Sequence, residues 1–77
     1  MKKSKKSYFV YLNLCTRTES KEVLYANELT YEQAQEEWKH ADDMLDWMYQ
    51  EYSCRSACIG NVNEASDYYV AERLGLI

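Results

Sequence analysis

The segment TYEQAQEEWKHADDMLDWMYQEY, residues 30–52, carries the clearest structural pattern of this sequence. Its apolar positions recur at alternating steps of three and four residues, the spacing of a helix with one buried face. These positions are Tyr31, Ala34, Trp38, Ala41, Leu45, Met48 and Tyr52. Thr30 followed by Gln33 forms a capping-box pattern directly before this periodicity begins. The sequence therefore predicts one long amphipathic helix from Tyr31 to about Tyr52.

The outer face of this predicted helix is acidic. Seven acidic residues stand against a single lysine, Lys39, in the 22 residues 31–52. At about 100° per residue, Glu32, Glu36 and Asp43 fall on one line opposite the apolar stripe, with gaps of about 6 Å and 10 Å along the axis. Such a row of carboxylates could imitate successive phosphates. The residues predicted to bind a partner are Glu32, Glu36, Asp43, Asp46 and Trp47.

Trp47 allows two interpretations. On the solvent-exposed face of the helix, a tryptophan surrounded by charged residues is typical of a binding hot spot. The alternative is that the C-terminal segment covers Trp47 as ordinary core, because a small fold must cover its helix with something. The apolar spacing also fits a coiled-coil seam, but its aromatic and alanine residues are unlike a zipper, so packing against strands is favoured.

Composition and charge limit the class of protein. Apolar residues make up 47% of the 77 residues and there is no proline, which favours a folded domain. The formal net charge is −4, yet four of the nine basic residues lie in the first six positions. The remaining five bases face thirteen acids, so residues 7–77 carry a net charge of −8. This acidic part of the chain is expected to repel the phosphate backbones of nucleic acids and to attract a basic protein surface. The alternative is that the acidic residues only promote solubility.

Two strands are expected before the helix. Residues 8–15 alternate, and Phe9 and Tyr11 indicate that the second face of this strand is also partly covered. Residues 22–29 alternate as well, after a polar five-residue loop at 16–20, which together predict a β-hairpin. The expected core comprises Val10, Leu12, Leu14, Val23, Tyr25, Leu29, Trp38, Leu45, Met48 and Ile59.

The C-terminal third has two interpretations. Residues 57–62 are expected to form a short third strand, after which Asn63 would cap a helix over residues 64–74 with Gly75 as its C′ residue. The alternative is a strand over 68–74, which would make a second hairpin. The predicted fold class is α+β: a flexible basic tail (1–7), then a single domain (8–77) with an N-terminal hairpin packed on one long helix.

The sequence offers little for metal or enzyme chemistry. Cys54 and Cys58 lie four residues apart and, with His40 and Cys15, make four conceivable zinc ligands, but no tight zinc-knuckle spacing is present. There is one histidine and there are two glycines, too few for a phosphate-cradling loop. We predict no metal, no cofactor and no enzymatic activity.

The N-terminus combines a basic segment with an apolar run that is too short for a secretory signal and interrupted by Asn13. No stretch approaches the roughly 20 apolar residues that cross a bilayer. We therefore expect a soluble, cytoplasmic protein with reduced cysteines.

These patterns lead to two hypotheses about function. The first is a small acidic inhibitor, of the kind that phages and mobile elements encode, which occupies a basic nucleic-acid-binding surface on a host defence, transcription or nuclease protein. Its partner would be that host protein, with no direct binding to nucleic acid or membrane. The second is a structural or adaptor domain, a monomer or homodimer that self-associates through its tyrosine-rich strands or its helix seam.

Overall fold

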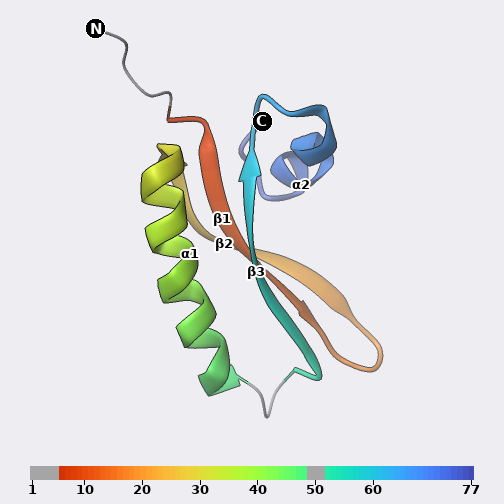
Figure 1. The fold of residues 1–77 in the computed structure, drawn as a ribbon. Helices are drawn as coiled ribbons and strands as arrows, with labels where there is room; N and C mark the ends of the chain where they lie inside the picture. The colour runs from red at the N-terminus through yellow and green to blue at the C-terminus, as the bar shows by residue number, and fades with distance from the viewer. Residues whose placement is uncertain (1–5, 49–51) are drawn as a thin grey trace, which may run out of the picture.

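The computed structural model describes residues 6–48 and 52–77, except for the side chain of Met48 (Figure 1). Its elements are β1 (Tyr8–Cys15), β2 (Ser20–Leu29), α1 (Tyr31–Leu45), the 3-10 turn η1 (Asp46–Met48), β3 (Cys54–Asn61), the 3-10 turn η2 (Ala65–Asp67) and α2 (Tyr68–Arg73). The strands form one antiparallel sheet in the order β2-β1-β3, so β1 lies in the middle. Helix α1 covers one face of this sheet and α2 lies on the other (Figure 1). The predicted α+β class is confirmed, with the C-terminal helix and not the second hairpin.

The predicted hairpin is present, and β2 begins two residues earlier than expected. The turn is closed by Thr16, whose N–H donates to the carbonyl of Glu19 at 2.7 Å and whose Oγ1 accepts from the Glu19 N–H at 3.1 Å. The register between β1 and β2 shifts between Tyr8 and Val10 and again between Val10 and Tyr11. Strand β2 therefore bulges twice, and Glu28, in the second half of this strand, has a positive φ of 55°.

The predicted capping box of α1 is confirmed. The Gln33 N–H donates to Thr30 Oγ1 at 3.2 Å, and the Thr30 N–H donates to Gln33 Oε1 at 3.0 Å. The predicted end of the helix at Tyr52 is wrong, because regular helix stops at Leu45 and Tyr52 is not helical. Residues 49–51 lie outside the described residues. The chain leaves the helix early because it must return to the sheet, where β3 begins to pair with β1 at Cys54.

The core lies between α1 and the sheet. Its fully buried members come from β1 and α1: Val10, Leu12, Leu14, Ala34, Ala41 and Leu45. Tyr25, Leu29 and Ile59 pack against them as partly buried side chains, as predicted. The predictions for Val23 and Trp38 are wrong, since they are 38% and 36% exposed. The prediction for Met48 falls on a side chain outside the described residues.

The positions of α1 and of the strands explain these two errors. Helix α1 contacts β3 and β1 more than β2, so Val23, on the outer strand β2, lies beyond the covered area. Trp38 lies against β3, the other outer strand, and its indole N–H donates to the carbonyl of Ala57 at 2.7 Å. An amphipathic indole is suited to this position because it packs along one side and keeps a hydrogen bond at its tip.

The second face of the sheet is covered at one end by α2. Phe9 is fully buried on this face, as is Ala71 of α2. Gly75 has φ 82° and ends α2 as the predicted C′ residue, while the Leu76 N–H donates to the Ala71 carbonyl at 2.8 Å. The predictions that Asn63 caps the helix and that the helix begins at residue 64 are wrong, because a 3-10 turn precedes α2. The Asp67 carboxylate accepts a hydrogen bond from the Asn61 N–H at 2.9 Å and does not cap α2.

An ion pair fastens the end of α2 to β2. The Arg73 guanidinium donates from Nε and Nη2 to the two carboxylate oxygens of Glu22, both at 2.6 Å. These hydrogen bonds hold the pKa of Glu22 below its ordinary value. The two side chains are 56% and 19% exposed, so the pair orients α2 more than it stabilises the fold.

Candidate partner-binding surface

The structure places all five predicted binding residues on the surface. Glu32, Glu36 and Asp43 lie in α1, and Asp46 and Trp47 lie in the 3-10 turn that follows it. Trp47 is 87% exposed, the largest exposure among the large apolar side chains of the described residues. The C-terminal segment does not cover it, because β3 continues the sheet and α2 lies on the opposite face from α1 (Figure 1).

The three helical carboxylates share the outward side of α1 because the alanines define the inward side. Ala34 and Ala41 are fully buried against the sheet. Glu32 and Asp43 lie in the same regular helix, about 16 Å apart along its axis. Asp46 and Trp47 follow in a 3-10 turn, which has about three residues per turn. The side-chain directions that a continuous α-helix would give these two residues therefore do not apply.

Among the residues that the structure describes, these four carboxylates make no contact that uses their charge. Within residues 6–48 and 52–77, no ion pair and no side-chain hydrogen bond involves Glu32, Glu36, Asp43 or Asp46. Lys39 is exposed between Glu36 and Asp43, so the row is interrupted by one positive charge. The carboxylates are therefore available to an external partner, and six acids face one lysine over the span 31–48.

The fold separates these carboxylates from most of the basic residues within 7–77. Arg17 lies in the hairpin loop and Lys21 on β2, where its Nζ is 5.5 Å from the centre of the Tyr52 ring. Arg55 lies on β3, and Arg73 is bound to Glu22. Four of the five basic residues in 7–77 thus lie outside α1. We call Glu32, Glu36, Asp43, Asp46 and Trp47 the acidic surface.

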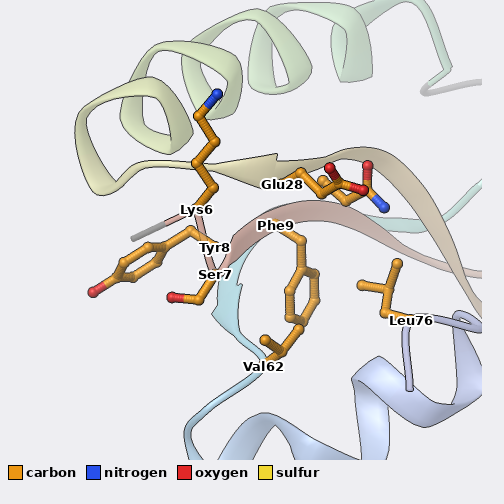
Figure 2. A pocket seen from close by; sticks show the side chains of 8 residues that line it. Lys6, Ser7, Tyr8, Phe9, Glu28, Val62 and Leu76 are labelled. Carbon is orange, nitrogen blue, oxygen red and sulfur yellow. The ribbon is translucent and has the colours of Figure 1, made fainter. Parts of the chain in front are cut away.

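A small cavity, which the sequence did not predict, lies at the end of the sheet where β1 begins and β2 ends (Figure 2). It measures about 150 Å³. Its lining comes from four separate segments: Lys6, Ser7, Tyr8, Phe9, Asn27, Glu28, Val62 and Leu76. Figure 2 shows the Phe9 ring next to Val62 and Leu76, while the side chains of Lys6 and Tyr8 extend away from it. The volume is below the roughly 300–1,000 Å³ of ordinary ligand pockets.

All three cysteines lie on strands. Cys54 and Cys58 both lie on β3, where four residues span about 13 Å. In the described part of the chain, no three His, Cys, Asp or Glu side chains are grouped to hold a metal ion.

No helix within the described ranges has both the length and the apolar character needed to cross a membrane.

No family model, curated protein or solved structure significantly matches this chain. Its function must therefore be inferred from its own residues.

Proposed function

We propose that the protein is a small non-enzymatic inhibitor that binds another protein through the acidic surface. The exposure of Trp47 carries this proposal, because an indole that is 87% exposed gains little within its own fold. In an interface the same side chain would be an anchor, surrounded by carboxylates that pair with arginine and lysine.

The charge of the surface indicates the chemistry of the partner. A row of exposed carboxylates on α1 complements a surface rich in arginine and lysine, such as one that binds nucleic acid. The same charge disfavours direct binding to phosphate backbones. The partner class is therefore a basic nucleic-acid-binding protein of a host, encountered in the cytoplasm, and the inhibitor is of the phage or mobile-element type.

Self-association through the strands is the alternative proposal, and the two sheet edges give it less support. On β3, the Ala57 carbonyl already accepts the Trp38 indole N–H. On β2, the two bulges and the positive φ of Glu28 interrupt the regular edge. Both features are devices that discourage edge pairing.

The proposal is tested by a charge reversal on the acidic surface. The tagged protein is used to capture proteins from host lysate at low salt, with and without competing DNA. We expect it to retain a nucleic-acid-binding protein that competing DNA or high salt releases. The double variant Glu36→Lys with Asp43→Lys should lose this capture.

The matched control carries the same charge change elsewhere. Glu64 and Glu72 are exposed outside α1, so Glu64→Lys with Glu72→Lys gives the same net charge. Capture lost equally in both double variants would reduce the effect to net charge. Capture that survives Glu36→Lys with Asp43→Lys would contradict the proposal.

A further inference from the structure

Two cysteines form the last rung of the β1–β3 ladder. Cys15 ends β1, Cys54 begins β3, and the register places them directly opposite each other. Antiparallel partners have Cα atoms about 4.5–5.5 Å apart. This range lies inside the roughly 4.4–6.8 Å that a disulfide spans. The Ser53 hydroxyl donates to the Cys15 carbonyl at 3.3 Å and holds the two strand ends together just beyond this rung.

The topology selects this pair from the three possible pairings. Cys58 lies four residues further along β3, about 13 Å from Cys54, and its partner on β1 is Tyr11. Cys15 is therefore far from Cys58 as well. Cysteines whose Cα atoms are more than about 7 Å apart cannot be bridged without backbone movement.

The two cysteines are direct neighbours across the ladder, and one of them is open to solvent. The proximity of Cys54 raises the pKa of Cys15, first through hydrogen bonding and then, after burial, through charge. Cys54 is exposed, whereas Cys15 is half-buried. An oxidant in solution therefore meets Cys54 first, with Cys15 in place behind it.

We propose that Cys15 and Cys54 are a reversible redox pair that closes to an intramolecular disulfide in the folded protein. The oxidant is a low-molecular-weight disulfide such as oxidised glutathione. The Cys54 thiolate attacks one sulfur of the oxidant and releases one small thiol. The Cys15 thiolate then attacks Cys54 Sγ and releases the second small thiol. The protein loses two protons and two electrons, and both electrons reside in the two released thiols.

The bridge would restrain a large part of the chain. It closes a loop over residues 15–54, which contains β2 and all of α1. A loop of this length removes much freedom from the unfolded chain, so the oxidised form should withstand more urea than the reduced form. In a reducing cytoplasm such a bridge is transient, which suits a sensor of oxidation and not a permanent structural bond.

The test uses the full chain equilibrated with mixtures of oxidised and reduced glutathione. Remaining thiols are alkylated, and the protein is cut with trypsin. Cleavage after lysine and arginine places each cysteine in its own peptide: 7–17 for Cys15, 40–55 for Cys54 and 56–73 for Cys58. We expect the loss of two of the three thiols, a cross-linked pair of peptides 7–17 and 40–55, and a higher urea midpoint that reduction reverses.

The variants separate this pair from other thiol chemistry. Cys58→Ser should form the same cross-link, whereas Cys54→Ser and Cys15→Ala should form no intramolecular bridge. Peptide mapping of the unsubstituted chain tests the pair even if a variant fails to fold. A cross-link that includes peptide 56–73 would overturn the proposal. It would also be overturned if all three folded thiols stayed alkylatable under conditions that oxidise the urea-unfolded chain.

Discussion

The ring of Phe9 on β1 lies directly over Gly60, its antiparallel partner on β3. A Cβ atom added to Gly60 would overlap the ring atoms of Phe9. Phe9 is fully buried, so any shift of its ring must be taken up by the neighbouring side chains and the small cavity beside it. Glycine is thus required at this position for the close approach of a side chain to the backbone.

Gly60→Ala should lower the free energy of unfolding by about 1–3 kcal/mol, because the added methyl overpacks this contact. Urea denaturation followed by circular dichroism measures the change. Ser56→Ala, at an exposed position on the same face of β3, is the matched control and should shift the free energy by less than about 0.5 kcal/mol. An unchanged midpoint for Gly60→Ala would mean that the Phe9 ring yields easily.

Substitution of the two tryptophans should affect different properties, stability for Trp38 and partner binding for Trp47. Trp38→Phe removes the hydrogen bond to the Ala57 carbonyl and should lower the free energy of unfolding by about 0.5–1.5 kcal/mol. Trp47→Phe should change it by less than about 0.5 kcal/mol, since that side chain is 87% exposed, while weakening capture of the partner. If Trp47→Phe were the more destabilising of the two, the assignment of Trp47 to the acidic surface would be wrong.

Glu28→Gly should stabilise the protein. The φ of 55° at Glu28 is strained for an L-residue with a side chain, at a cost of about 1–3 kcal/mol. Glycine removes this strain but gives the unfolded chain more freedom, so we expect a net gain of about 1 kcal/mol in urea denaturation. Asn27→Gly, one residue earlier and without positive φ, should instead be destabilising. A loss of stability in both variants would show that the Glu28 side chain matters more than its backbone.

Tyr11 should make stability fall at high pH. Burial raises the pKa of Tyr11 from 10.0 to about 12, with smaller contributions from Cys58, Asp67 and Glu22. Because the folded pKa lies above the unfolded one, the fold favours the protonated phenol. This contribution is fully present below pH 10 and is lost as the pH rises to about 12.

Urea midpoints measured across this interval should therefore fall less steeply in Tyr11→Phe than in the unsubstituted chain. Tyr69→Phe is the control, since Tyr69 is 67% exposed. Ultraviolet titration of the tyrosinate should also show one late-titrating group that Tyr11→Phe removes. Parallel slopes in all three proteins would contradict this role of Tyr11.

Local signals in the sequence predicted those features that neighbouring residues control. Thr30 and Gln33 identify the start of α1 because both partners of the capping box lie within one turn. Gly75 identifies the end of α2 for a similar reason, since a left-handed residue closes a helix locally. The bounds of β1 follow from its own apolar alternation.

Features that depend on distant pairing were predicted poorly. The apolar period continues to Tyr52, but α1 ends at Leu45 because β3 must begin pairing at Cys54. Phe9 was expected to be only partly covered, and its full burial depends on α2, which lies more than fifty residues away in the chain. Trp38 has core spacing, yet its place beside the outer strand β3 leaves it 36% exposed.

The acidic surface also combines features that a local pattern predicts with features that depend on distant contacts. That the carboxylates of α1 lie opposite its apolar stripe can be inferred from the local pattern, because both follow from the period of one helix. The exposure of Trp47 cannot be inferred in this way, since it depends on which face of the sheet α2 covers. The register of β1 against β3 likewise decided that Cys15 meets Cys54, a pairing 39 residues apart that no local pattern encodes.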